Sequence, residues 1–237
     1  MNTTAAAPWL CLDIETKEGR PEDVIAWLRH HWWPQENLKP DTNLRKLETL
    51  IEDKKTKLAL MDSAGLATVQ LATAEQTLLL HAFHAEEPRL MEDAAVMGFA
   101  TEPELLIFLR DWLRTNCDEK TTIVGWNIKG FDLPRLRLMF LRAGLQLPPQ
   151  LKVSADVYDM MKEYCRHFSV DRVEFMKLLV ALEQMGIPTR KAEINGSMVG
   201  AMIAEKRFED VLRYGLGDIR EEKELFLRMS GQSAQLK

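Results

Sequence analysis

The residues with the clearest potential for chemistry are Asp13 and Glu15, which stand at the end of the apolar run 9–14. That run has the composition of a buried strand, and because strand side chains alternate between faces, both carboxylates point the same way. Two like charges on one face repel each other unless a cation lies between them. Oxygen ligands of this kind select hard ions such as Mg²⁺ or Mn²⁺. An Asp-x-Glu sequence is also common by chance, so a solvated strand end is the simpler interpretation of this motif alone.

A second candidate site follows the run 121–126, which predicts another buried strand. Asn127 stands at the turn, Gly130 is expected to allow an unusual backbone angle, and Asp132 opens a helix. The helix dipole alone would favour an aspartate in a first turn. It does not account for Asn127, Phe131 and Asp132 together, directly after a strand.

A third candidate site is the pair Tyr214 and Asp218, which share one face of a predicted helix because they stand four residues apart. Gly215 and Gly217 lie between them, and each weakens a helix by roughly 1 kcal/mol relative to alanine. Close approach of another backbone, a metal or a substrate would explain the two glycines. A capped surface that carries a Tyr-Asp pair is the plainer alternative.

The elements that must position these side chains alternate between strands and helices. Strands are expected at 9–14, 66–72, 76–83, 121–126 and 152–155, and helices at 21–33, 43–57, 101–115 and 131–143, with only helices after the last strand. This order predicts an α/β fold with a mixed five-stranded sheet flanked by helices. We expect one domain over 1–237, with a helical insertion at about 17–60.

Taken together, the three sites resemble the three exonuclease motifs of the DnaQ-like, ribonuclease-H-like superfamily. The matching residues are Asp13 and Glu15, then Asn127, Phe131 and Asp132, then Tyr214 and Asp218. The resemblance covers nearly the whole chain and implies a three-layer ribonuclease-H-like fold and a 3′–5′ exonuclease. Segments 33–39, 57–65 and 186–196 are similar to insertions of stand-alone exonucleases related to family-B DNA polymerase proofreading domains.

The residue before Tyr214 separates two subclasses of this superfamily. A histidine general base would stand five positions before the last aspartate, and Arg213 occupies that place. Tyr214 therefore resembles the tyrosine of the DEDDy subclass, whose members include polymerase proofreading domains and ribonuclease D.

The resemblance implies two divalent metal ions, Mg²⁺ or Mn²⁺, and phosphodiester hydrolysis. Asp13, Glu15 and Asp218 would hold the ion that acidifies the attacking water, and Asp13 would bridge to the second ion. Asp132 would complete the site, through waters of that second ion. The product would be a nucleoside 5′-monophosphate.

The resemblance also implies roles beside the metal ligands. Tyr214 would orient the water, since an unperturbed phenol, with a pKa near about 10, is a poor base at neutral pH. Asn127 and Phe131 would contact the terminal nucleotide, although Phe131 suits a place in the core equally well.

The expected substrate is the 3′ end of single-stranded DNA. The same chemistry on RNA stays open, because no residue decides whether the site admits a 2′-hydroxyl. A catalytically inactive nucleic-acid-binding module is a further alternative, which predicts that at least one carboxylate is missing. All four carboxylates are present, together with Tyr214.

The composition is that of an ordinary globular protein of 237 residues with a net charge of −5, which argues against a passive protein that coats nucleic acid. Neither a signal peptide nor an apolar run long enough to span a membrane is found, so a cytoplasmic protein without membrane association is expected. Cys11, Cys117 and Cys165 lie far apart, which predicts buried free thiols and no zinc site.

Overall fold

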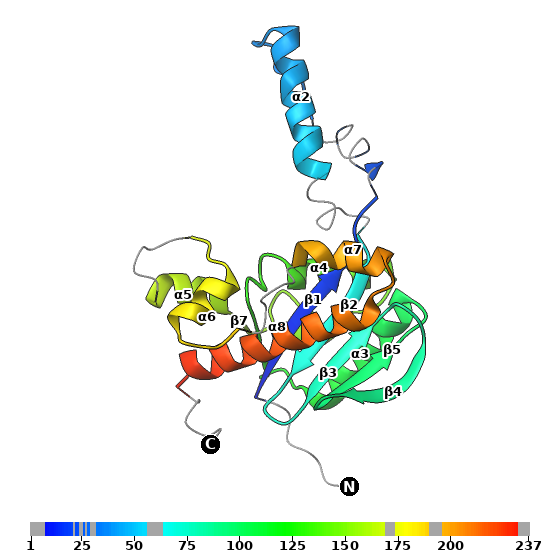
Figure 1. Ribbon diagram of the computed structural model, residues 1–237, viewed down its shortest axis with the longest axis vertical. Coiled ribbons are helices and arrows are strands. Elements are labelled where there is room, and N and C mark those ends of the chain that lie inside the picture. Colours follow the sequence, from blue (N-terminus) through cyan, green and yellow to red (C-terminus); the bar gives the residue numbers. More distant parts are fainter. Residues whose placement is uncertain are drawn as a thin grey trace.

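The computed structural model of the protein describes residues 8–20, 22–23, 26, 28, 32–55, 64–168, 174–189 and 196–231. The strands of this part of the chain form one seven-stranded sheet of order β4-β5-β3-β2-β1-β6-β7 (Figure 1). They are β1 (Trp9–Thr16), β2 (Leu66–Ala72), β3 (Thr77–His81), β4 (Glu86–Met91), β5 (Ala94–Gly98), β6 (Thr122–Gly125) and β7 (Val157–Asp159). The helices are α2 (Pro40–Lys55), α3 (Glu102–Asn116), α4 (Asp132–Arg142), α5 (Met160–His167), α6 (Leu178–Gln184), α7 (Val199–Ala204) and α8 (Phe208–Met229).

The sheet is mixed, as the order of strands and helices predicts. β1 pairs antiparallel with β2 and parallel with β6, and β7 continues the parallel part. On the other side β2 and β3 are antiparallel, β3 and β5 parallel, and β4 and β5 antiparallel. The predicted α/β architecture with a mixed sheet flanked by helices is confirmed, whereas the predicted number of five strands is wrong.

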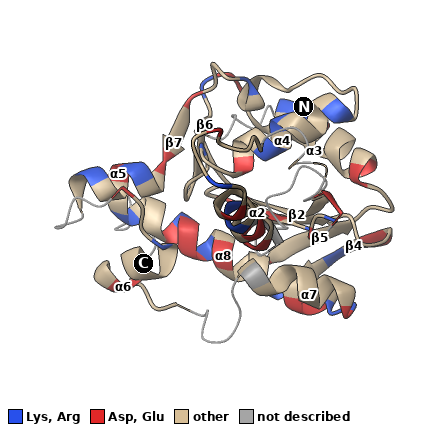
Figure 2. Ribbon diagram, turned by 90° about the horizontal axis from the view of Figure 1, so that it is seen from above, with Lys and Arg blue, Asp and Glu red and all other residues tan. Residues whose placement is uncertain are grey.

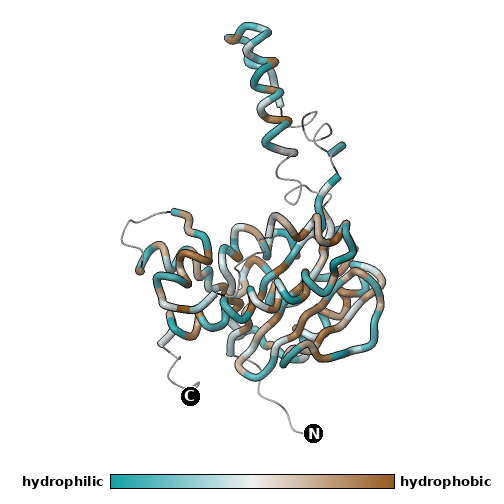
Figure 3. Tube along the Cα trace, in the orientation of Figure 1, coloured by the Kyte–Doolittle hydropathy of each residue, from teal (hydrophilic) through white to brown (hydrophobic). Residues whose placement is uncertain are grey.

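Two apolar clusters, one on each face of the sheet, hold these layers together. Leu10, Leu12 and Ile14 of β1 pack toward α3 and α4. Cys11, which points to the opposite face, packs with residues of α5, α6 and α8. Hydrophobic residues run along the strands, and in the helices they alternate with hydrophilic ones (Figure 3). β1 is therefore covered on both faces, and the predicted burial of the cysteines is confirmed for all three, which are free thiols.

The strands β4 and β5 are the elements that the sequence pattern missed. β4 reads Glu-Glu-Pro-Arg-Leu-Met and lies at the edge of the sheet, where charged residues and proline discourage pairing with other chains. Such residues also hide the strand from a search for apolar alternation. A turn at Glu92, whose φ is 56°, joins β4 to β5.

The strand predicted at 152–155 is wrong, because these residues form a turn and the strand β7 follows them at Val157–Asp159. The Arg137 guanidinium holds this turn by donating to the carbonyl oxygens of Leu151 and Lys152. β7 has only three residues, so its own pattern is too short to reveal it, and its pairing with β6 defines it.

The predicted ends of two helices agree with the structure. Thr101 caps α3, with Thr101 Oγ1 accepting from the Glu104 amide and the Glu104 carboxylate accepting from the Thr101 amide. α4 ends before Gly144, which has a left-handed φ of 68°. The helix predicted at 21–33 falls largely outside the described residues.

The helix predicted at 43–57 is present as α2, which stands away from the sheet as an arm (Figure 1). The arm leaves the body at the end of β1, where the Lys17 amide donates to the Gly65 carbonyl over 2.8 Å. α2 carries both basic and acidic residues (Figure 2). Its apolar residues pack in a separate small cluster with Leu28 and Trp32. Across the described residues, no helix has the length and hydrophobicity required to cross a bilayer.

Candidate metal centre

Three of the predicted carboxylates come together at the end of β1. Asp13, Glu15 and Asp218 each offer one oxygen, and these oxygens all lie within 4.8 Å of one another. Asp13 and Glu15 point from one face of β1, as the alternation of strand side chains requires. Asp218 reaches them from α8, which lies across that face (Figure 1). The cluster therefore unites residues from the two ends of the sequence.

The close approach of α8 to the sheet depends on Gly215. A Cβ atom at Gly215 would lie 2.2 Å from Nε2 of Gln70, which is a forbidden distance. Gln70 stands opposite Asp13 on β2 and is buried, and its Nε2 donates to Thr68 Oγ1 over 2.7 Å. The group that approaches Gly215 is therefore the side chain of Gln70, and not another backbone, a metal or a substrate as expected. At Gly217 the space around a Cβ atom is open, so the same explanation does not apply there.

Asp132 is placed next to the cluster but is not one of the three gathered carboxylates. It is 3% exposed, and its Oδ1 accepts from the backbone amide of Ile14, the residue between Asp13 and Glu15, over 3.1 Å. Burial raises the pKa of Asp132 to about 7, against the opposing effect of its backbone hydrogen bonds. This contact fixes the start of α4 against β1.

The charged form of Asp13 is strongly disfavoured in the absence of a cation. Burial raises its pKa well above the ordinary value, and the negative charges of Glu222, Asp132, Glu15 and Asp218 raise it further. Its Oδ2 atom is buried and has no hydrogen-bond partner among the residues that the structure describes. A buried acceptor surrounded by carboxylates fits a divalent cation, because the cation would reverse the sign of the local charge.

Tyr214 lies on α8 one turn before Asp218, to which its hydroxyl is hydrogen-bonded. Burial and the neighbouring carboxylates raise the pKa of Tyr214 well above its ordinary value. The phenol therefore stays protonated and acts as a hydrogen-bond donor. Arg213, at the position of a histidine in the other subclass, is exposed.

The turn after β6 differs in one detail from the expectation. The unusual backbone angle belongs to Asn127, with φ 56°, and not to Gly130. A Cβ atom at Gly130 would lie 2.4 Å from the Asn127 Oδ1 atom, so any other residue there would displace the Asn127 side chain. Phe131 is partly buried against the core, and the Arg135 guanidinium lies 5.6 Å from its ring centre. The backbone carbonyl of Asn127, the other predicted substrate-binding residue, accepts from the amides of Gly130 and Phe131 and so closes the turn that leads to Asp132.

Of the two buried acids near the cluster, Glu222 and Asp159, only Glu222 was missed as a candidate by the sequence analysis. Glu222 follows Asp218 by one helical turn, is 3% exposed, and contributes to the raised pKa of Asp13. Its spacing of four residues from Asp218 was the signal that could have revealed it. Asp159 caps α5 through the Lys162 amide, and its charge adds to the raised pKa of Asp132.

No protein-family model matches the chain, and no curated protein matches it either. What the fold and the site define is an α/β protein with a partly buried acidic triad that could hold a hard divalent cation.

Proposed function

We propose that the protein is a metal-dependent 3′–5′ exonuclease of the tyrosine subclass, acting on single-stranded DNA and releasing nucleoside 5′-monophosphates. The observation that carries the proposal is the meeting of Asp13, Glu15 and Asp218, whose oxygens lie within 4.8 Å of one another. These residues come from the first and third of the motifs that resemble the superfamily. The second motif contributes Asp132, which contacts the backbone between Asp13 and Glu15.

The sheet topology is compatible with a ribonuclease-H-like fold. We take the five adjacent strands β3-β2-β1-β6-β7 of the seven-stranded sheet as the counterpart of a five-stranded ribonuclease-H-like sheet. β4 and β5 then extend that sheet at the β3 edge. In this interpretation the extra hairpin lies away from β1 and leaves the arrangement around Asp13 unchanged.

In the proposed reaction the side chains hold the phosphodiester and the attacking water in line. When bound, two Mg²⁺ or Mn²⁺ ions supply an acidified water and balance the charge on the leaving oxygen. Asp13, Glu15 and Asp218 would hold these ions together with Asp132. Tyr214, which stays protonated, orients the water by donating a hydrogen bond and does not remove its proton.

RNA is the second candidate substrate, because the described residues include no group with an evident preference at the 2′ position. An inactive binding module is disfavoured by the gathering of carboxylates around Asp13, whose burial and whose acidic neighbours raise its pKa. A module that only binds nucleic acid gains nothing from such an arrangement, which costs folding free energy.

The test is cleavage of short DNA and RNA oligonucleotides labelled at the 5′ end, in the presence of Mg²⁺ or Mn²⁺. We expect a ladder of products shortened from the 3′ end and no ladder in the presence of EDTA. Removal of groups that merely support metal ligands costs about 10–100-fold, so Asp13→Ala should reduce the rate by at least about 100-fold. Tyr214→Phe should reduce it less.

Glu87→Gln is the matched control, because Glu87 is an exposed acid on β4, far from the cluster in the sheet order. It should cleave like the wild type. Absence of shortening for both nucleic acids would refute the proposal, and full activity of Asp13→Ala would refute the assignment of the site.

A further inference from the structure

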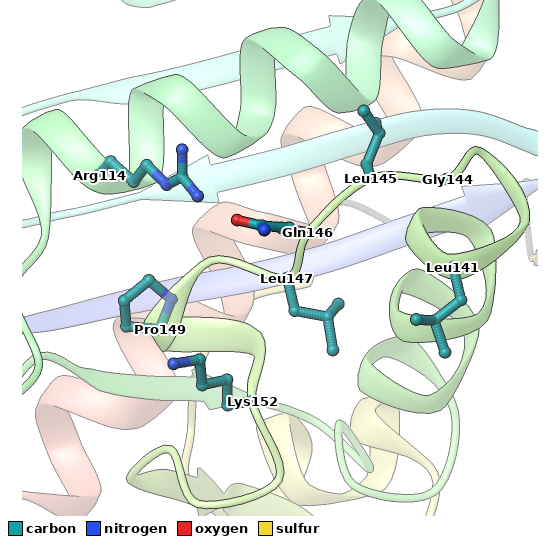
Figure 4. A pocket seen from close by; sticks show the side chains of 8 residues that line it. All are labelled: Arg114, Leu141, Gly144, Leu145, Gln146, Leu147, Pro149 and Lys152. Carbon is teal, nitrogen blue, oxygen red and sulfur yellow. The ribbon is translucent and has the colours of Figure 1, made fainter.

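A hollow of about 760 Å³ lies between the C-terminal ends of α3 and α4 and the loop that leads to β7 (Figure 4). Its volume is within the range of about 300–1,000 Å³ that is usual for ligand pockets. The residues that line it include Arg114, Leu141, Leu145, Gln146, Leu147 and Lys152.

The hollow has a cationic side and an aliphatic side. Figure 4 shows Arg114 and Lys152 on one side, with Leu141 and Leu147 opposite. None of its lining residues is acidic, although the whole chain carries a net charge of −5. Within the described part of the chain, neither Arg114 nor Lys152 forms an ion pair, although Arg114 lies near Asp111, whose carboxylate is paired with Arg110. Leu141 is 65% exposed, which leaves a large aliphatic side chain in contact with water.

The walls of the hollow are held in place by buried hydrogen bonds. Gln150 is 4% exposed, and its Nε2 donates to the Cys117 carbonyl at the end of α3 over 3.0 Å. Arg137 of α4 donates to the Leu151 carbonyl over 2.6 Å. The Leu145 amide donates to the Phe140 carbonyl over 2.9 Å and closes the end of α4. The loop is thus tied to both helices, and the hollow exists without a ligand.

The hollow is separate from the metal centre. α4 starts beside the centre at Asp132 and runs for 11 residues to the hollow at its other end. At 1.5 Å per residue this helix is about 16 Å long. The lining charges also have the opposite sign to those of the acidic cluster. A ligand of the hollow need not be the substrate of the proposed reaction.

We infer that the hollow binds a peptide segment of a partner protein in which acidic residues flank leucine, isoleucine or phenylalanine. The carboxylates would pair with Arg114 and Lys152, and the apolar side chain would cover Leu141 and Leu147. Nucleic acid fits less well, because no aromatic ring lines the hollow and bases bind single-strand sites by stacking.

The experiment uses the full-length protein, fluorescently labelled, and three pools of octapeptides displayed on beads. The first pool combines Asp or Glu with Leu, Ile or Phe, the second replaces the acids by Lys or Arg, and the third replaces the apolar residues by Ser or Asn. We expect enrichment only from the first pool. The affinity of an enriched peptide is then measured by fluorescence anisotropy, up to about 1 mM peptide.

Two variants locate the binding site. The double variant Arg114→Glu with Lys152→Glu should weaken binding by about tenfold or more, since like charges would now face each other. Leu141→Asp should weaken it through the apolar side, and because Leu141 is exposed the fold should be retained, as circular dichroism can check. Lys162→Glu with Arg166→Glu, two exposed cations on α5, is the matched control and should bind like the wild type.

Cleavage of oligonucleotides is measured in parallel and should be the same in all these variants, so the inference stands or falls independently of the proposed function. Equal binding of the three pools, or equal affinity of the Arg114→Glu/Lys152→Glu variant, would overturn it. So would a tenfold loss of single-stranded DNA affinity in that variant without any peptide binding, since the hollow would then be a nucleic-acid site.

Discussion

Asp13 lies among other carboxyl groups, and burial makes its charged form costly. A cation that binds there stabilises the folded protein over the unfolded chain, which has no such cluster. At a concentration of one hundred times the dissociation constant, the gain is about 2.7 kcal/mol. Thermal unfolding with and without Mn²⁺ should therefore show a clear increase of the midpoint for the wild type.

Asp13→Asn should lose most of that response, because it removes a charged ligand and keeps the side-chain volume. Without Mn²⁺ it should be as stable as the wild type or more stable, since it replaces a carboxyl group whose charged form is costly at this position by a neutral amide. Glu87→Gln serves again as the control. An unchanged Mn²⁺ response in Asp13→Asn would contradict the assignment of Asp13 as a metal ligand.

His81 is a second residue whose charge state affects stability. It is fully buried on β3, its Nε2 lies 2.7 Å from the Glu86 carboxylate, and its Nδ1 accepts from the Phe83 amide. Burial lowers its pKa, despite the opposing effect of Glu86, so the ring is neutral and donates from Nε2. The unfolded chain then binds a proton more readily than the folded protein.

The contribution of His81 to the free energy of unfolding should consequently be independent of pH above the ordinary histidine pKa of about 6.5. Below that pH, the free energy of unfolding should decrease as the pH is lowered. The largest slope from one such group is about 1.4 kcal/mol per pH unit. Chemical denaturation at a series of pH values between about 5 and 8, the range in which histidine changes its charge, measures this dependence of stability on pH. His81→Gln should flatten this dependence, and an equal slope in that variant would refute the explanation.

At the level of secondary-structure elements, α8 offers a matched pair of glycines. Gly215→Ala would place its Cβ atom 2.2 Å from Gln70 Nε2, so that either the buried Gln70 side chain or α8 must shift. Gly217→Ala enters open space on the same helix. We expect the first variant to be destabilised by about 1–3 kcal/mol and the second to be stabilised by up to about 1 kcal/mol.

Denaturant unfolding of the two variants distinguishes these effects, because helix propensity alone predicts that both gain stability. Gly215→Ala should also weaken the Mn²⁺ response, since Asp218 moves with α8. Equal gains in stability for both glycine variants would show that the packing of α8 against Gln70 is not tight.

Some elements could be predicted because their signals are local. Thr101 and Glu104 stand three residues apart and specify the start of α3 by themselves. The elements that were missed depend on partners distant in the chain: β5 pairs with β3, and the short β7 pairs with β6. Tertiary pairing overrides weak local preference in such strands.

The same distinction applies to the site. Asp13, Glu15 and Asp218 could be proposed from their residue types and their order, and the structure brings these three together. The packing of Gln70 against Gly215 of α8 could not be predicted, since the place of Gln70 opposite Asp13 follows from the register of β1 and β2. The left-handed angle at Asn127 was assigned to Gly130 because glycine is the commoner residue in that conformation.

At the scale of the whole molecule, the arm that contains α2 should be dispensable for folding. Among the described residues, the two large apolar clusters contain no residue from the segment between Lys17 and Gly65. The backbone hydrogen bond between Lys17 and Gly65 joins the two ends of that segment. Replacement of residues 18–64 by a short Gly-Ser linker should give a protein with a similar midpoint of thermal unfolding. A control variant, Leu50→Asp, should disturb only the small cluster in the arm.

Circular dichroism and calorimetry of the shortened chain check this expectation, with the loss of helical signal limited to the arm. A midpoint lowered by more than about 8 °C would correspond to more than about 2 kcal/mol for a domain of this size, and would show that the arm supports the body.

The hydrogen bond from the Ile14 amide to Asp132 joins residues 118 positions apart, and Asp218 stands farther still along the chain. Contacts across such separations form only after long loops have closed, which is entropically costly and slow. On the ribosome the first two carboxylates emerge long before α8 is synthesised. The nascent chain consequently carries no assembled triad of Asp13, Glu15 and Asp218 until α8 is made, and any activity of this site requires that helix to be in place.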